Sequence, residues 1–188
     1  MRTSSRDQIV QVAYEMFQRS GFHAVGLDAI LAEVGVTKTT FYNHFPSKDA
    51  LIQETLEWKD RWWQETFREV LRKHGGDTPR GQLLAIFDAL DDFFSCGGFN
   101  GCFFVNVALQ YPAMHSPAHQ AAAAHKRAME DIIRELAGYA GSGDPQALAR
   151  ELSLVMEGYY VTRQVTGSTE VGEVASRVAQ RMIESSLA

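Results

Sequence analysis

The sequence has few of the residues that mark disulfide-rich, secreted or membrane-spanning proteins. Only two cysteines, Cys96 and Cys102, occur among its 188 residues, which is too few for a disulfide framework, and they do not form a C-x-x-C pair. No run approaches the roughly 18 apolar residues of a membrane-spanning helix, and the start of the chain, MRTSSRDQIV, lacks the apolar segment of a signal peptide. We therefore expect a cytoplasmic protein whose thiols are reduced.

The signatures of common enzymes are missing as well. The chain contains no P-loop, no dinucleotide-binding fingerprint and no serine elbow, and its histidines show no local pairing with a nucleophile. His115, His119 and His125 do not have the spacing of a compact tetrahedral site, and neither a thiolate nor an obvious carboxylate accompanies them. We expect no enzymatic activity, no cofactor and no metal.

The two parts of the chain differ in charge, although the whole is acidic with a net charge of −5. Residues 1–48 carry five Lys and Arg against four Asp and Glu, whereas residues 49–188 carry 13 against 19. The first part therefore has a net charge of +1 and the second a net charge of −6. This asymmetry would orient the N-terminal part toward phosphate, although a single net charge is a weak nucleic-acid footprint.

The segment of residues 27–48, LDAILAEVGVTKTTFYNHFPSK, has the pattern of a helix-turn-helix. Its first helix carries an apolar stripe at i, i+3, i+4 and i+7, formed by Leu27, Ile30, Leu31 and Val34. Gly35 can adopt positive φ and reverse the chain, and Thr37 can cap the next helix. Phe41 and Phe45 would anchor that second helix on the core, leaving a polar outer face. With an amphipathic helix before it, the segment predicts a three-helix unit.

This part of the chain resembles the DNA-binding domain of the TetR/AcrR family of bacterial transcriptional repressors. The resemblance extends from residue 21 to residue 51 and is carried by Gly21-Phe22, Asp28 with Ile30, Gly35-Val36, Lys38, Phe41-Tyr42 and the ending His44-Phe45-Pro46-Ser47-Lys48. It implies an all-α protein, with a helix-turn-helix DNA-binding domain in residues 1–48 and a helical effector-binding and dimerisation domain in residues 49–188. Apolar periodicity predicts about nine helices in total, of which one covers residues 79–94.

The DNA-binding residues are expected on the outer face of the second helix of this motif and just after it. They are Lys38, Thr39, Thr40, Tyr42, Asn43, His44 and Lys48. Thr39, Thr40 and Asn43 are the expected readers of base edges, while the others contact phosphates or a thymine methyl group. The chain departs from the family at Val25-Gly26, where a pair of hydroxyl residues is common. Without the resemblance, the same pattern also fits an ordinary helical hairpin with a solvated face.

Aromatic residues are frequent in the middle of the second part. The residues expected to line an effector pocket are Trp62, Trp63, Phe87, Phe94, Cys102, Phe103, Asn106, His115, Tyr159 and Tyr160. An apolar cavity with a few polar groups suits a small hydrophobic or aromatic ligand. Plain core packing explains the same aromatic residues, so the pocket is an expectation that comes from the resemblance.

The last two expected helices, near residues 146–165 and 169–185, carry apolar stripes that a second copy could cover, which would create a homodimer with twofold symmetry. The two DNA-binding domains of the dimer would then contact major grooves about 34 Å apart on a palindromic operator. The resemblance implies a repressor that a ligand releases from DNA. One alternative is an electrophile- or redox-sensing repressor that uses Cys102, because a thiol at the start of a helix can be activated. A more distant alternative is an architectural DNA binder without an effector.

Overall fold

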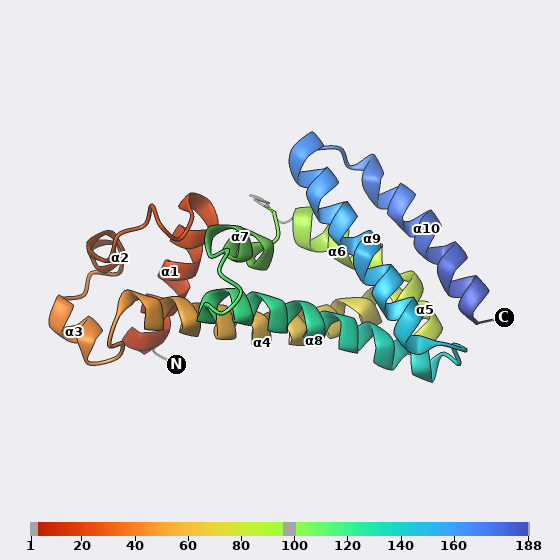
Figure 1. Cartoon of the computed structure of the whole chain (residues 1–188), viewed down its shortest axis with the longest axis horizontal. Helices are drawn as coiled ribbons and strands as arrows, with labels where there is room; N and C mark the ends of the chain where they lie inside the picture. The colour runs from red at the N-terminus through yellow and green to blue at the C-terminus, as the bar shows by residue number, and fades with distance from the viewer. Residues whose placement is uncertain (1–3, 96–100, 188) are drawn as a thin grey trace. The chain divides into compact units, whose positions relative to one another are not determined.

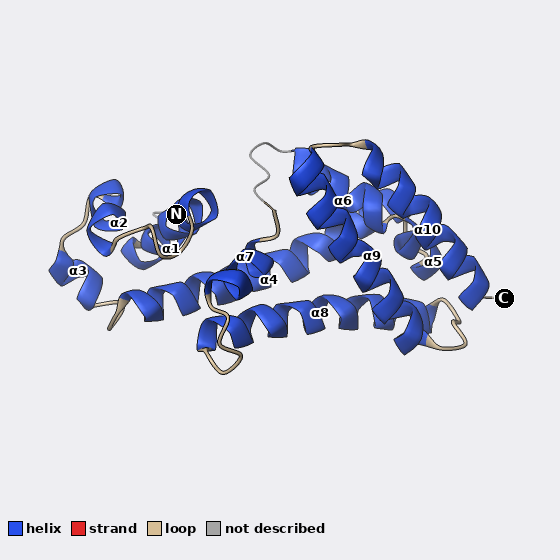
Figure 2. Cartoon of the chain, turned by 45° about the horizontal axis from the view of Figure 1, so that its top comes forward, coloured by secondary structure: helices blue, strands red, loops and turns tan. Residues whose placement is uncertain are grey.

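The computed structural model describes residues 4–95 and 101–187, and the regular structure in these ranges is helical (Figure 2). Figure 1 follows the helices in chain order from red to blue. Their bounds are α1 Ser5–Ser20, α2 Leu27–Val34, α3 Lys38–Tyr42, α4 Lys48–Gly75, α5 Pro79–Leu84, α6 Ile86–Ser95, α7 Phe103–Gln110, α8 Pro117–Tyr139, α9 Pro145–Thr166 and α10 Glu170–Ser186. None of these described helices combines the length and hydrophobicity needed to cross a bilayer. The predicted all-α fold is confirmed.

The structure divides one predicted helix into two, which gives ten helices in the described ranges instead of about nine. Residues 79–94 form α5 and α6, because the backbone at Ala85 leaves α geometry, with φ −85° and ψ 1°. The start of α5 also lies very close to the end of α4. A Cβ atom added to Gly81 would lie 2.1 Å from the carbonyl oxygen of Gly75. Glycine is needed there because any side chain would overlap that backbone.

Polar side chains cap several of the helices and set where they begin. Ser4 accepts a hydrogen bond from the backbone N–H of Asp7 at 3.2 Å and so starts α1. Thr37 does the same for α3 and Asp144 for α9. These caps satisfy backbone donors that have no partner within the first turn of a helix.

The chain forms two compact units, and both are discontinuous in sequence. Unit 1 comprises Met1–Trp62 and Cys102–His125, and unit 2 comprises Trp63–Gly101 and Lys126–Ala188. Unit 1 therefore holds α1 to α3, the first part of α4, α7 and the start of α8, while unit 2 holds the rest. The boundary expected at residue 48 concerns function and stays a prediction.

The core of unit 1 fixes the three N-terminal helices against the start of α4. Its fully buried side chains include Ile9, Ala13, Phe22, Ile30, Phe41 and Leu51. The rings of Phe17 and Phe22 stack with centroids 4.8 Å apart, which ties the end of α1 to the loop that follows it. This packing holds the helix-turn-helix in place through side chains from every one of its helices.

Unit 2 has a separate core. Its fully buried side chains include Phe67, Leu71, Ile86, Phe87, Leu90, Ile133, Leu152, Tyr159 and Ile183. They come from the end of α4, α6, α8, α9 and α10, and α9 and α10 lie side by side in both views (Figures 1 and 2). Apolar burial of this extent stabilises the unit by the hydrophobic effect.

Candidate nucleic-acid interface and effector residues

The turn before α3 is built by a glycine and the residue after it. Gly35 adopts the left-handed conformation, with φ 78° and ψ 32°, and its N–H donates to the carbonyl of Leu31 at 2.9 Å. The N–H of Val36 donates to the same carbonyl at 3.1 Å. Thr37 then caps α3 by accepting from the N–H of Thr40 at 3.1 Å. These bonds fix the angle at which α3 leaves α2.

Two phenylalanines hold α3 against the core of unit 1. Phe41 is fully buried and Phe45 is 3% exposed, and their ring centroids lie 5.5 Å apart. Phe45 lies beyond the end of α3, because the helix tightens when the N–H of His44 donates to the carbonyl of Phe41 at 2.8 Å. The remaining side chains of the segment must then face outward.

The side chains expected to contact DNA lie on this outward face. Lys38, Thr39, Tyr42, Asn43 and His44 are exposed, and Tyr42 retains 56% of its accessible surface. Thr40 is half-buried, and its hydroxyl lies 3.0 Å from that of Thr37. The face therefore presents hydroxyl, amide, imidazole and ammonium groups, which are the groups that meet phosphates and base edges.

Lys38 is paired in this structure with an acidic residue of α2. Its ammonium lies 2.9 Å from the carboxylate of Asp28, and this hydrogen bond raises the pKa of Lys38. Both side chains are exposed, so the pair is screened by solvent and contributes little to stability. Lys38 can therefore exchange the carboxylate for a phosphate at small cost.

Lys48 lies in a different environment. Its ammonium donates to the carbonyl of Phe22 at 2.7 Å, and desolvation lowers the pKa of this lysine. The side chain also passes over the ring of Phe17, with 5.8 Å between the ammonium and the ring centroid. Lys48 thus holds the loop after α1, and its expected phosphate contact stays a prediction.

The loop after α1 also forms hydrogen bonds with the end of α7, a contact that sequence analysis did not predict. Gln110 accepts a hydrogen bond from the N–H of Phe22 at 2.8 Å, and His23 Nε2 lies 2.9 Å from the Gln110 carbonyl oxygen. Gly21 has φ 80°, and a Cβ atom added there would lie 3.0 Å from the amide oxygen of Gln110. The close approach therefore depends on glycine at this position.

Four of the residues expected to bind an effector are gathered in unit 2. Phe94 stacks on Tyr159 with centroids 5.4 Å apart, Tyr160 meets Phe94 edge-on at 5.5 Å, and Phe87 meets Tyr159 at 5.7 Å. Phe87, Tyr159 and Tyr160 are buried. Such packing supports a role in the core at least as well as a role in binding. A fifth residue, Trp63, packs on Phe93 with ring centroids 4.4 Å apart.

A charged network that sequence analysis missed lies beside these aromatic rings. The hydroxyl of Tyr159 donates to Asp91, whose carboxylate also accepts from the guanidinium of Arg163 at 2.5 Å. Burial, followed by the hydrogen bond to Asp91, raises the pKa of Tyr159 well above its usual range. Arg163 is four residues after Tyr159 on α9, a spacing that places both on one face of the helix. That spacing was the one available signal, but it does not identify Asp91.

The other residues expected to bind an effector lie in unit 1. Phe103 is buried and contacts the ring of Tyr14 at a centroid distance of 5.0 Å. Cys102 occupies the N-cap of α7 and is half-buried, as is Asn106. His115 is exposed. Trp62 is 38% exposed and carries a lysine ammonium over its ring. Cys96 lies outside the described residues.

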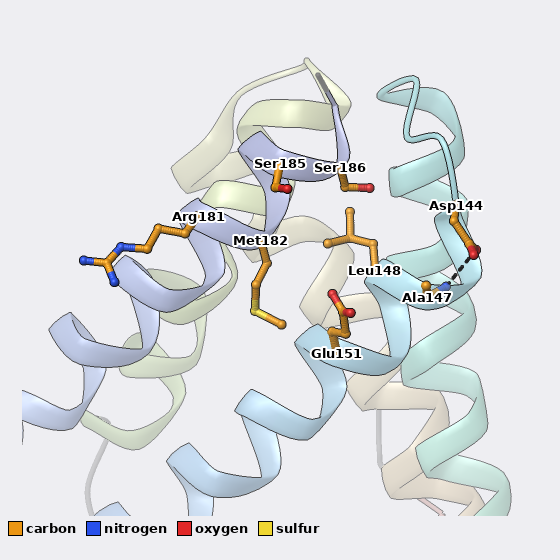
Figure 3. A pocket seen from close by; sticks show the side chains of 8 residues that line it. All are labelled: Asp144, Ala147, Leu148, Glu151, Arg181, Met182, Ser185 and Ser186. Carbon is orange, nitrogen blue, oxygen red and sulfur yellow. Dashed lines mark hydrogen bonds between the residues drawn. The ribbon is translucent and has the colours of Figure 1, made fainter.

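Two hollows that sequence analysis did not predict are lined by described residues. One, of about 410 Å³, lies in unit 2 between the start of α9 and the end of α10 (Figure 3). Figure 3 shows Leu148 and Met182 pointing into the space between the two helices, while Arg181 points away. The other, of about 320 Å³, lies in unit 1 between the start of α4 and the loop before α8, and Tyr111 is one of its lining residues. Neither hollow includes a residue that was expected to bind an effector.

The histidines do not form a metal site in the part of the chain that the structure describes, where no group of three or more potential ligands is close enough to hold an ion. His119 Nδ1 lies 2.9 Å from the carbonyl oxygen of Tyr111, and His125 Nδ1 lies 2.7 Å from the carboxylate of Asp60. Each of these two imidazoles therefore has a specific structural contact.

Comparisons with known proteins agree with this architecture. The family model for bacterial regulatory proteins of the tetR family matches residues 9–55, which run from α1 into α4. HTH-type transcriptional regulator YjdC of Escherichia coli K12 is 24% identical over 178 residues, which cover 95% of this chain and 93% of that protein. SCO4454, a TetR-family transcriptional regulator from Streptomyces coelicolor, has a crystal structure that matches with a TM-score of 0.89 and 29% identity, covering 98% of this chain and 96% of that one. The reduced form of E. coli NemR shares the fold, with a TM-score of 0.83, 20% identity and coverage of 95% and 97%.

Proposed function

The chain belongs to the TetR family of bacterial transcriptional regulators, and from this premise we propose that it is a ligand-responsive repressor. In this proposal a homodimer binds a palindromic operator, and a small hydrophobic or aromatic effector releases it. The observation that carries the proposal is the polar outer face of α3, which is held outward by buried Phe41 and Phe45.

DNA reading is assigned to that face. Thr39 and Asn43 are exposed on it and can reach base edges in a major groove, while Lys38, Tyr42 and His44 can contact the backbone. A short recognition helix needs a rigid support to keep its register on the duplex. The caps and buried aromatic rings of unit 1 supply that support.

Dimerisation is assigned to α9 and α10. These helices expose large apolar side chains, and Leu154 and Val165 are 74% and 78% exposed. Val161, Val174 and Val178 are also exposed. Burying such side chains against the same surface of a second copy is favourable and produces the twofold symmetry that a palindromic operator requires.

Release by an effector requires the ligand to favour a conformation that DNA does not favour, because a ligand with equal affinity for both states shifts nothing. The aromatic side chains of α6 and α9 in unit 2 support an apolar or aromatic ligand. Native mass spectrometry of the purified protein tests this assignment directly. A bound small molecule is the expected result, and its loss should raise affinity for the operator.

The central experiment selects duplexes from a random library with the purified protein and then measures their binding by fluorescence anisotropy. The expected result is an enriched palindrome that binds two protomers for each pair of half-sites. Equal affinity for the selected and random duplexes at one salt concentration would overturn the proposal.

A second experiment tests the proposed dimer. Leu154→Glu should reduce the fraction of dimer measured by light scattering, and Tyr139→Glu, at a similarly exposed site on α8, is the matched control.

A second candidate function is thiol-based sensing through Cys102. Its position at the N-cap of α7 and its partial exposure favour this reading, because backbone N–H groups at a helix start stabilise a thiolate. The test treats the protein–operator complex with an electrophile and compares the wild type with Cys102→Ser. Release of the wild type alone supports sensing, and equal release of both excludes it.

A further inference from the structure

Unit 1 contains a buried lysine, Lys59, that forms no ion pair with the residues that the structure describes. Lys59, on α4, is 8% exposed, and its ammonium lies 3.4 Å from the ring centroid of Trp62 and 4.6 Å from that of Tyr14. Within residues 4–95 and 101–187 this ammonium has no hydrogen bond and no ion pair. Lysine is rarely buried to this degree unless it is paired.

Two of the acidic residues near Lys59 along α4 are engaged elsewhere. Glu54 lies 2.6 Å from the guanidinium of Arg6, and Asp60 lies 2.7 Å from the imidazole of His125. Tyr14 cannot supply the missing charge either. Burial raises the pKa of its hydroxyl to about 12, so the side chain is neutral at physiological pH. The ammonium therefore lies over two neutral aromatic side chains.

Desolvation makes this arrangement unfavourable for the charged form, and it lowers the pKa of Lys59 to about 8. The two rings compensate in part through cation–π attraction. The rings supply no hydrogen-bond acceptor of the kind that an oxygen atom offers an ammonium group. An anion that approached the ammonium would supply both a counter-charge and hydrogen-bond acceptors.

We propose that the Lys59 ammonium, with Trp62 and Tyr14 beside it, binds the acidic group of an organic anion that has an aromatic or hydrophobic body. The carboxylate or sulfonate of the ligand would accept charge-assisted hydrogen bonds from Lys59, which are among the strong ones in proteins. Its apolar body would pack on the neighbouring rings. The inference rests on the proposed effector response and names the chemical class of the effector.

Several aromatic residues around Lys59 could contact such a body. Tyr14 meets Trp58 at a centroid distance of 5.5 Å and Phe103 at 5.0 Å. Trp62 and Phe103 are both among the residues that the sequence predicts to bind an effector. Tyr14 belongs to α1, which packs against α2 of the helix-turn-helix. A ligand at Lys59 would therefore contact a helix of the DNA-binding domain directly.

The test uses two fluorescent probes with the same ring system. Anilinonaphthalene sulfonate carries an anionic group, and phenylnaphthylamine does not. Binding of each is measured by energy transfer from tryptophan to wild type, Lys59→Met, Lys59→Arg and the control Lys73→Met. Lys73 is an exposed lysine of unit 2 that pairs with Asp92 at 2.7 Å, so its loss removes one positive charge from a different place.

We expect Lys59→Met to weaken binding of the sulfonate by about tenfold or more, because a charge-assisted hydrogen bond is lost. Binding of the uncharged probe should change by less than about threefold, since the rings remain. Lys59→Arg should retain part of the sulfonate affinity, and Lys73→Met should retain all of it. Circular dichroism and thermal unfolding confirm that each variant is folded.

Three results would overturn the inference: no saturable binding of the sulfonate to the wild type, equal loss of both probes in Lys59→Met, or equal loss of the sulfonate in Lys73→Met. None of these measurements involves DNA. Sulfonate binding that depends on Lys59 but leaves operator affinity unchanged would count against the proposed effector response and leave the anion site intact. An effector response that is unchanged in Lys59→Met would remove this site and leave the proposed function standing.

Discussion

Replacing Lys59 with methionine should make the protein more stable at neutral pH. The substitution removes a buried ammonium that has no counter-charge and keeps an unbranched apolar side chain in contact with Trp62 and Tyr14. Most substitutions of buried residues destabilise a protein, so an increase would identify a position where stability is given up for another purpose.

The expected size of the effect follows from the pKa of Lys59. A decrease in pKa from 10.5 to about 8 means that folding disfavours the protonated lysine by about 3 kcal/mol, at about 1.4 kcal/mol for each pKa unit. The wild type also has cation–π contacts that methionine cannot make, and their loss reduces the advantage of the variant by about 1 to 2 kcal/mol. The free energy of unfolding of Lys59→Met should therefore exceed that of the wild type by about 1 to 2 kcal/mol at pH 7.

The pH dependence gives a more specific signature. Between about pH 8 and 10.5 the unfolded chain holds the Lys59 proton more tightly than the folded chain does, so this group makes stability rise with pH in that window. The advantage of Lys59→Met should accordingly shrink between pH 7 and about pH 9.5. Higher pH must be avoided, because Tyr14 has a raised pKa and acts in the opposite direction above about pH 10.

The assay is urea unfolding followed by circular dichroism at pH 7 and about pH 9.5. All proteins are at one protomer concentration, because the proposed dimerisation would add to apparent stability. Lys73→Met reports the effect of removing an exposed lysine and should be close to neutral. A lower stability of Lys59→Met at pH 7 would refute the reasoning. So would a difference between the variant and the wild type that does not change with pH.

Three further substitutions test the candidate DNA interface and its support. Asn43→Ala should weaken operator binding by about 1 to 3 kcal/mol and relax one base position in a repeated selection, and an unchanged selected sequence would remove Asn43 from base reading. Lys48→Ala should lower the salt slope of operator binding by about one unit if its ammonium reaches a phosphate, whereas an unchanged slope with lower stability would assign it to the carbonyl of Phe22. Gln110→Ala should cost about 1 to 3 kcal/mol of stability in urea, because the N–H of Phe22 loses its acceptor. Gln120→Ala, at an exposed position on α8, is its control, and equal losses in the two variants would contradict this role.

Local patterns were sufficient to predict most of the helices. The expected segments 146–165 and 169–185 correspond to α9 Pro145–Thr166 and α10 Glu170–Ser186. Apolar periodicity and caps act within a few residues, so a single sequence contains the information. The break at Ala85 was not predicted, since it accompanies a close approach between Gly75 and Gly81 that periodicity does not report.

In the candidate sites, too, features set by neighbouring residues could be predicted, and features set by residues distant in sequence could not. The outward face of α3 could be predicted because Phe41 and Phe45 are local anchors whose burial leaves the other side chains exposed. The partners of Gln110 and Tyr159 lie 88 and 68 residues away in sequence, so no local pattern points to them. The position of Lys59 on Tyr14 likewise depends on packing between distant helices.

Solvation separates the roles of three lysines that the sequence does not distinguish. Lys38 is exposed and paired with Asp28, so it can exchange one anion for another with little desolvation. Lys48 is half-buried and donates one hydrogen bond to the Phe22 carbonyl, which leaves other N–H groups of its ammonium for a phosphate. Lys59 is 8% exposed, so a rigid DNA backbone cannot reach it. The burial of each lysine therefore decides whether an anion as large as a DNA backbone can approach its ammonium.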